Sequence, residues 1–289
     1  MTSPRFAVTA ASGQLGRLAI AAFAERAGPE AVVAIVRDPA RAAGLFPDGV
    51  AIRHGDYERP ETLDAAFAGI ERLLLISSNA LGARVAQHRN AIDAARNAGV
   101  ARIAYTSVLR TDSLQLDLAE EHRQTEALIA ASGLAHTLLR NGWYTENYTA
   151  SIPPALQHGA FIGSARDGRI SGAARADYAE AAAIALTDDA APARVLLELA
   201  GDQSFTLTEF AAELSRQAGR EIPYVDLPEA DYRAALTGAG LPEPLPGLLS
   251  ACDAAAAEGA LFDEGQQLSR LIGRATTPFA ATIAEALKG

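Results

Sequence analysis

The first half of the chain alternates short apolar runs with longer stretches in which apolar residues recur at helical spacing. The short runs predict strands at 6–9, 31–37, 50–53, 72–76, 102–106 and 135–139. The longer stretches predict helices at 14–27, 60–68, 82–98 and 118–131. The run at 31–37 is apolar on both faces, as in a parallel sheet that helices cover on both sides. This order predicts right-handed crossovers and an α/β fold with a doubly wound parallel sheet of the Rossmann type.

The regular alternation ends after Asn141. Pro153-Pro154 and a run at 161–172 that is rich in glycine and arginine interrupt it. Further on, the pattern predicts a helix at 179–186, a strand at 195–199, a helix at 207–218 and a mostly helical tail from Glu229. We therefore expect a large sheet domain at 1–150. We expect a smaller C-terminal α+β lobe at 151–289, on the substrate side, with some elements returning to the main domain.

The segment TAASGQLG, at 9–16, joins the first predicted strand to the first predicted helix. A glycine-rich turn in this position lets the backbone approach a pyrophosphate, and the helix N-terminus offers free N–H groups. Its spacing resembles the GxxGxxG of short-chain dehydrogenases, with alanine in place of the first glycine. An ordinary strand–helix turn is the alternative. The residues predicted to bind the dinucleotide here are Ala10, Ser12, Gly13, Gln14, Leu15 and Gly16.

Arg37 ends the second predicted strand, where NAD-dependent enzymes carry an acidic residue for the ribose hydroxyls. A guanidinium suits a 2′-phosphate by charge and by geometry, so Arg37 predicts NADPH rather than NADH. A strand-end arginine that only faces solvent is the alternative. Asp38 could contact the ribose, but it is better placed to cap a helix that Pro39 begins.

Polar residues also follow the third and fourth predicted strands. Asp56 fits a contact with the edge of an adenine, with Tyr57 packed nearby, although a turn or a helix cap explains Asp56 nearly as well. Ser77 and Ser78 end the fourth strand, at the edge where open α/β sheets bind their ligands. We expect all four residues to contact the cofactor.

The sixth strand is followed by NGWY, which holds the only tryptophan. Trp143 and Tyr144 could cover a nicotinamide and a flat substrate, and Asn141 could form a hydrogen bond to either. Packing between the two domains is the alternative for both rings.

The composition narrows the function classes. The formal net charge of −10 argues against a nucleic-acid partner. The single cysteine rules out an intrachain disulfide and indicates a reducing compartment. The five histidines lack metal-site spacing, no signal-like apolar segment follows the N-terminus, and no stretch of about 20 apolar residues suits a membrane. We expect a cytoplasmic enzyme without a metal.

Taken together, the blocks TAASGQLG, VAIVRDPAR, QHRNAIDAARNAGV, LLRNGWYTENY and LAGDQSFTLTEFAAEL resemble the NmrA-like atypical short-chain dehydrogenases/reductases, above all bacterial members that reduce quinones. The resemblance covers almost the whole chain. It implies NADPH in a cleft between two lobes and direct hydride transfer to a small quinone, without flavin. It also implies a set of cofactor contacts at Gly13, Gln14, Leu15, Gly16, Arg37, Ser77, Ser78 and Asn141. Trp143 and Tyr144 would lie near the quinone, with Tyr144 as the candidate catalytic residue.

Two features depart from the wider superfamily. Ala10 replaces a glycine, and the usual YxxxK acid pair is replaced by Leu118 and His122. A quinone accepts hydride readily and can take its proton from water, so the missing acid agrees with quinone reduction. The alternative function is a redox sensor that binds NADP(H) without turnover. The sequence leaves the oligomeric state open.

Overall fold

The computed structural model describes residues 4–114 and 116–288. The chain forms two compact units. The first comprises the described parts of 1–112, 119–141 and 175–198, and the second comprises those of 113–118, 142–174 and 199–289. The expected division into folding domains near residue 150 stays a prediction.

The first unit is built on a seven-stranded sheet in the order β3-β2-β1-β4-β5-β6-β8. Its strands are β1 (Phe6–Val8), β2 (Val32–Val36), β3 (Ala51–His54), β4 (Arg72–Leu75), β5 (Arg102–Val108), β6 (Ala135–Asn141) and β8 (Arg194–Leu199). The pairs from β3 through β6 are all parallel. This confirms the predicted doubly wound α/β fold.

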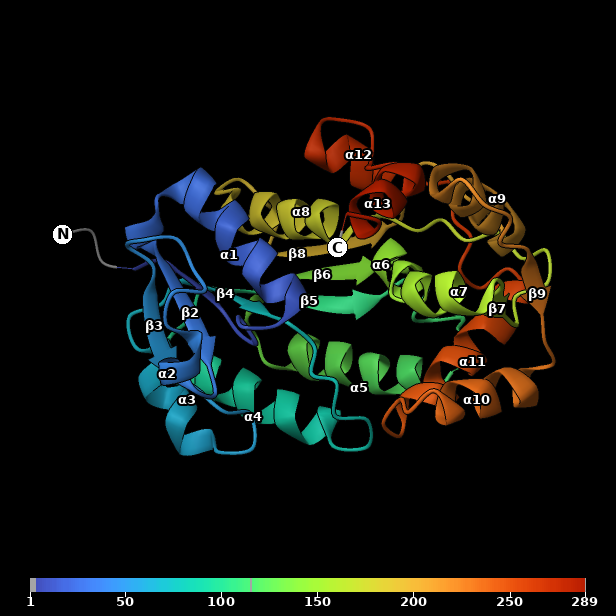
Figure 1. Ribbon diagram of the computed structural model, residues 1–289. Helices are drawn as coiled ribbons and strands as arrows, with labels where there is room; N and C mark the ends of the chain where they lie inside the picture. The colour runs from blue at the N-terminus through green and yellow to red at the C-terminus, as the bar shows by residue number, and fades with distance from the viewer. Residues whose placement is uncertain (1–3, 115, 289) are drawn as a thin grey trace. The chain divides into compact units, whose positions relative to one another are not determined.

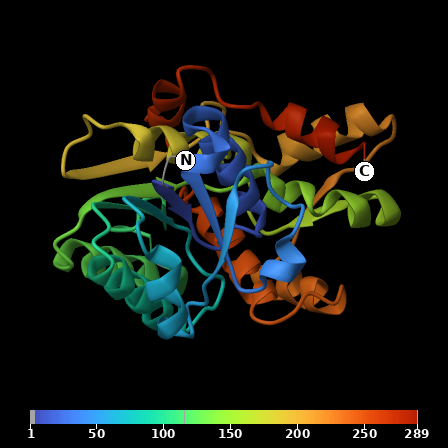
Figure 2. The same cartoon turned by 90° about the vertical axis from the view of Figure 1, so that its left-hand side faces the viewer.

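Helices cover both faces of this sheet (Figures 1 and 2). Helices α1 (Gln14–Ala27) and α8 (Arg175–Thr187) lie on one face, and α3 (Pro60–Phe67), α4 (Arg84–Asn97) and α5 (Asp117–Ala131) lie on the other. The short α2 (Pro39–Ala42) follows β2. Side chains such as Leu63, Phe67 and Ile92 pack against the buried strands in one core cluster. Burial of both sheet faces explains why the inner strands β1 and β2 are apolar throughout.

Several predicted limits differ from the structure. Strands β5 and β6 continue to Val108 and Asn141, past the expected ends at 106 and 139. The added residues of β6 include Arg140, which is polar but is buried by its partners in the fold, and a hydrophobic pattern does not register such a residue. Helix α8 begins at Arg175 rather than at residue 179.

The second unit is mainly helical, with one small parallel sheet of β7 (Phe161–Gly163) and β9 (Tyr224–Asp226). Its helices are α6 (Thr145–Thr149), α7 (Ile152–His158), α9 (Leu207–Ala218), α10 (Glu229–Gly238), α11 (Leu245–Ala257), α12 (Gln267–Ile272) and α13 (Phe279–Ala286). Phe161, Phe205 and Phe210 form the centre of its core. Within the described residues, no helix is both long and apolar enough to cross a bilayer.

Candidate dinucleotide site

The turn between β1 and α1 is fixed to the neighbouring strand β4 by Thr9. This side chain is fully buried, and its hydroxyl donates to the Leu74 carbonyl (3.1 Å) and accepts from the Ile76 backbone N–H (3.0 Å). The turn therefore leaves the sheet from a rigid base.

Backbone geometry explains the residue types of this turn. Gly16 lies so close to the turn that a Cβ there would come within 2.4 Å of the Ala10 carbonyl oxygen. Ala10 has a φ of 48°, in the left-handed region that favours glycine. Alanine here is strained, which agrees with the departure noted in the sequence.

Helix α1 opens toward this turn without a side-chain cap. Its N-cap residue, Gly13, contributes no side-chain hydrogen bond. The first N–H groups of a helix have no acceptor within the helix. These groups, together with the helix dipole, form an electropositive end that suits a phosphate.

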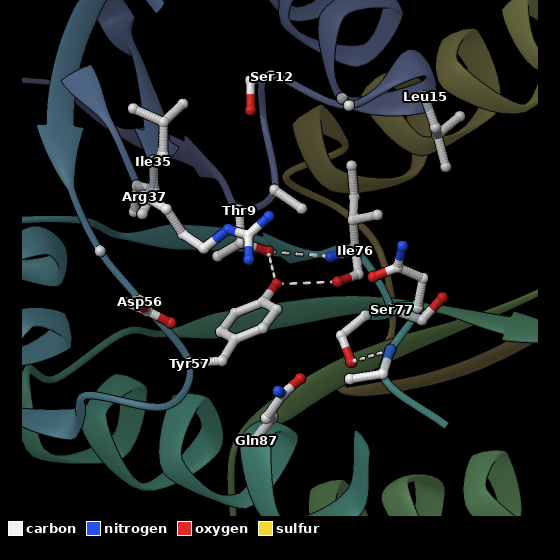
Figure 3. Close-up of a pocket in the computed structure, with 18 of the residues that line it drawn as sticks. Thr9, Ser12, Leu15, Ile35, Arg37, Asp56, Tyr57, Ile76, Ser77 and Gln87 are labelled. Carbon is white, nitrogen blue, oxygen red and sulfur yellow. Dashed lines mark hydrogen bonds between the residues drawn. The ribbon is translucent and has the colours of Figure 1, made fainter. Parts of the chain in front are cut away.

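The two charged residues that follow β2 have different roles. Asp38 caps α2, with its carboxylate accepting from the Arg41 backbone N–H (3.1 Å), as the sequence favoured. Arg37 is exposed and makes no hydrogen bond or ion pair with any residue between 4 and 288 that the structure describes. Its guanidinium extends into the cavity in Figure 3. It is therefore available to an anionic ligand.

Tyr57 forms a wall of the same cavity (Figure 3). Its hydroxyl lies within hydrogen-bond distance of the Ile76 carbonyl oxygen (2.8 Å) and of the Thr9 hydroxyl. Burial raises the pKa of Tyr57, so the phenol stays protonated and neutral. Asp56 accepts from the Glu58 backbone N–H (3.0 Å), which shows a turn role and leaves its expected adenine contact a prediction.

These elements enclose a cavity of about 370 Å³. All the residues predicted to bind the cofactor line it, except Asn141, which ends β6 and is 4% exposed. The lining residues that the sequence analysis missed are Thr9, Ile35, Val36, Gly55, Glu58, Ile76, Asn79, Ala80 and Gln87. Most are neighbours of predicted residues and could have been found by extending each strand end. Gln87, inside α4, gave no comparable signal.

Known proteins resemble this chain both in sequence and in fold. The model of a family described as NAD(P)H-binding matches residues 10–189. Quinone oxidoreductase 2 of Escherichia coli is 49% identical over 96% of each chain. The chain belongs to the NmrA-like, NAD(P)H-binding family. This confirms the resemblance found in the sequence.

Solved structures extend the match to the fold. The NADPH complex of an Escherichia coli NADPH-dependent quinone oxidoreductase superposes with a TM-score of 0.92 at 48% identity, covering 98% of this chain and 99% of that one. Triphenylmethane reductase from a Citrobacter species gives 0.92 at 34% identity, covering 99% and 100%. The same reductase complexed with NADP(H) gives 0.91, covering 97% of this chain and 99% of that one.

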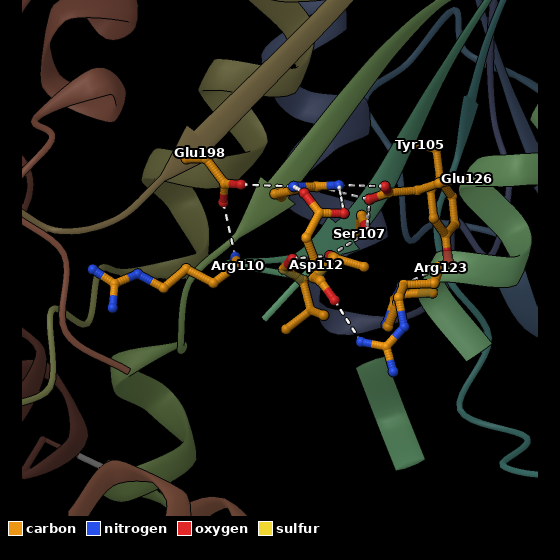
Figure 4. A network of polar contacts seen from close by, with 11 residues as sticks. Tyr105, Ser107, Arg110, Asp112, Arg123, Glu126 and Glu198 are labelled. Carbon is orange, nitrogen blue, oxygen red and sulfur yellow. Dashed lines mark hydrogen bonds and ion pairs between the residues drawn. The ribbon is translucent and has the colours of Figure 1, made fainter. Parts of the chain in front are cut away.

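This NmrA-like chain has an ionic cluster around Arg140, near the end of β6. Figure 4 shows its three carboxylates, Asp112, Glu126 and Glu198. The Arg140 side chain is 5% exposed. Its guanidinium donates to both oxygens of Glu126 (3.0 and 2.7 Å), to both of Asp112 (2.7 and 3.0 Å) and to Glu198 (2.9 Å). The Ser107 hydroxyl also donates to Glu126. Ser107 is thus engaged inside the protein.

His122, the residue in place of the superfamily lysine, is also engaged. Its Nδ1 lies 2.7 Å from the Tyr105 hydroxyl. Burial, with the nearby charge of Arg84, lowers the pKa of His122 well below its usual value. The ring is therefore neutral, and it cannot serve as an acid near pH 7.

Trp143 and Tyr144 belong to the second unit. Their backbone pairs with the segment at Ala173: the Ala173 N–H donates to the Trp143 carbonyl (3.2 Å), and the Thr145 N–H donates to the Ala173 carbonyl (3.0 Å). Trp143 also packs against the core of its unit. The contacts hold this backbone in place, and the roles of the two rings stay predictions.

Proposed function

We propose that this protein is an NADPH-dependent oxidoreductase that reduces small quinones by two electrons. The observation that carries the proposal is the likeness to Escherichia coli quinone oxidoreductase 2, which extends over nearly the whole of both chains. The cavity agrees with this function because its residues suit the charges of NADPH.

The fit to NADPH rests on three features of the first unit. The uncapped end of α1 would receive the pyrophosphate, with Gly13 and Gly16 allowing close approach. The Arg37 guanidinium, which has no partner among residues 4–114 and 116–288, would pair with the 2′-phosphate. Ser77, Ser78 and the other residues of the lining would hold the rest, and Asn141 at the end of β6 is proposed as a further contact. Bound NADPH would supply the hydride.

The chain's own residues would orient the quinone and leave the proton to solvent. Ser107 and His122 are committed to partners within the protein, so neither replaces the missing tyrosine acid. A quinone that gains a hydride becomes a hydroquinone after one proton from water. We propose that Trp143 and Tyr144 contact the flat ring, and that Tyr144 donates a hydrogen bond to the developing oxygen charge.

The test is the loss of the NADPH absorbance band when benzoquinone is added to the purified protein. We expect one NADPH to be oxidised for each hydroquinone formed. Tight NADPH binding without oxidation, over a panel of quinones, would instead favour a sensor that binds NADP(H) without turnover.

The aromatic contacts have a separate test. Trp143→Ala should raise KM for the quinone more than KM for NADPH, and Tyr144→Phe should lower kcat only modestly because water can replace the donor. A Trp143→Ala protein that melts earlier but keeps normal quinone kinetics would assign the rings to packing alone.

The composition supports a proposal for the cellular compartment and for the class of partner. We propose a cytoplasmic enzyme, since the chain has one cysteine, and its net charge of −10 disfavours nucleic acid as a partner. The proposed partner is therefore a small molecule. Fractionation of the source cells would check the compartment.

A further inference from the structure

Helix α4 contacts residues of the candidate site through the segment QHRN, at 87–90. Gln87 lines the cavity, and its amide donates to the Glu58 carboxylate (3.0 Å), which lines it too. Asn90 donates to the Tyr57 carbonyl (2.8 Å). Figure 3 shows Gln87 on the same side of the cavity as Tyr57. Two residues of this segment thus hold the segment that follows β3.

The third contact is made by His88, which is fully buried. Its Nε2 accepts from the Ser78 backbone N–H (3.0 Å), which fixes the proton on Nδ1 because a backbone N–H can only donate. That Nδ1–H donates to the Thr125 hydroxyl (3.0 Å), which donates in turn to the Glu121 carbonyl (2.9 Å). Each donor in this series of hydrogen bonds has an acceptor, so both ring nitrogens of the neutral imidazole are hydrogen-bonded.

The other polar group of Ser78 is held from the same helix. Arg84, which is buried, donates from Nε to the Ser78 carbonyl (2.7 Å) and pairs with Glu121 (3.1 Å). The second oxygen of Glu121 accepts from the Gly82 backbone N–H (2.7 Å). The N–H and the carbonyl of Ser78 are therefore both fixed by α4, one through His88 and one through Arg84.

The His88 ring also packs against Tyr57, which forms a wall of the cavity. It meets the Tyr57 ring edge to face at 6.0 Å and the Tyr105 ring at 5.3 Å. Burial, with the charge of Arg84, lowers the pKa of His88 to about 3, so the ring keeps its acceptor across the physiological range. One neutral side chain thus touches both the strand end at Ser78 and the Tyr57 wall.

We infer that His88 is a positioning residue for NADPH binding: it holds the Ser77–Ser78 edge of the cavity in the conformation that receives the cofactor. The inference rests on the proposed function for the identity of the ligand. Without the anchor, the free protein would populate other conformations of this edge, and apparent affinity would fall by the lost fraction of competent molecules. Chemistry at saturating NADPH would be unaffected, because His88 reaches the site only through other residues.

The experiment measures the Kd for NADPH by calorimetry, with KM and kcat for NADPH and for benzoquinone. We expect His88→Leu to raise the Kd and the KM for NADPH about tenfold, with kcat and the quinone KM unchanged. His88→Gln should stay within about threefold of the parent protein, since its amide can both accept from Ser78 and donate to Thr125.

Two matched controls separate positioning from stability. His122→Leu removes a second buried imidazole, which is bonded to Tyr105 rather than to a residue of the cavity. It should lower the melting temperature but leave the NADPH Kd unchanged. Arg89→Ala alters an exposed side chain on the same helix and should change neither.

Several results would overturn the inference. They are an unchanged Kd in His88→Leu, an equal loss of affinity in His122→Leu, or a His88→Gln protein as weak as His88→Leu. If His88→Leu does not fold, Thr125→Val removes the acceptor that orients the ring, and an unchanged Kd in that variant would overturn it too. A parent protein that fails to bind NADPH would contradict the proposed function instead, so the two failures are distinguishable.

Discussion

Two arginines at the carboxyl edge of the same sheet differ in burial and in the number of their partners. Arg140, in β6, is 5% exposed and donates to three carboxylates, whereas Arg37, just after β2, is exposed and unpartnered among the described residues. Burial alone would lower the pKa of Arg140, but its hydrogen bonds to Glu126, Asp112 and Glu198 outweigh burial and raise that pKa. A buried charge must be paired internally. A charge left open at this edge is available to a ligand.

The largest expected effect is on the free energy of unfolding and comes from disrupting the buried ionic cluster around Arg140. Arg140→Met leaves the buried Glu126 without its cation, which should cost about 3–5 kcal/mol of unfolding free energy. Urea unfolding measures it. Arg37→Ala, as the matched arginine control, should stay within about 0.5 kcal/mol of the parent protein. Equal stability of the two variants would break the comparison.

Acid should also lower the stability of the protein, because it protonates the buried imidazoles. His88 has a folded-state pKa of about 3, against about 6.5 unfolded, so its contribution is complete above pH 6.5 and is lost as pH falls toward 3. Within that window the loss is about 1.4 kcal/mol per pH unit. Urea unfolding at pH 7 and pH 5 should therefore show a smaller drop for His88→Gln than for the parent protein. Parallel curves would contradict this.

Arg37, which has no partner among the described residues, should determine the preference for NADPH over NADH. Arg37→Ala removes a charge-assisted hydrogen bond worth about 1.5–3 kcal/mol. The ratio of kcat/KM for NADPH over NADH should therefore fall about ten- to hundredfold. If the ratio does not change, the phosphate-binding role of Arg37 is wrong.

The smallest effect is expected at Ala10, whose φ of 48° suits glycine better. Ala10→Gly should lower the Kd for NADPH by about two- to threefold, because it removes a methyl group and backbone strain from the turn. The higher entropy of the unfolded glycine variant opposes any gain in stability. Calorimetry that finds weaker binding would mean that the turn has adapted to alanine.

Local signals predicted most of this site. The glycines of the turn and the strand ends at Arg37 and Ser77 lie in continuous segments, and a parallel sheet brings all its carboxyl ends to one edge. Helix α1 begins and ends at the predicted residues because its apolar face is regular and Gly28 follows it.

The rest of the site depends on contacts between distant segments. Arg140 joins Asp112, Glu126 and Glu198, and no short pattern in the sequence links these four positions. Gln87 reaches the cavity from the first turn of α4, away from any strand end. The strands β7 and β9 have three residues each, too few to show an alternating pattern.

The approach of α1 to the turn also constrains how the family can vary. Any side chain at Gly16 would place its Cβ against backbone atoms of Ala10 and Ala11, at 2.4 to 2.7 Å, and backbone cannot move aside as a flexible side chain does. Ala10 itself shows that the first glycine of the motif tolerates a methyl group. In a saturation-mutagenesis library selected for quinone reduction, codons at position 10 should therefore drift among small residues, while position 16 should return glycine alone. The three glycines of the family motif are thus not equivalent targets of selection.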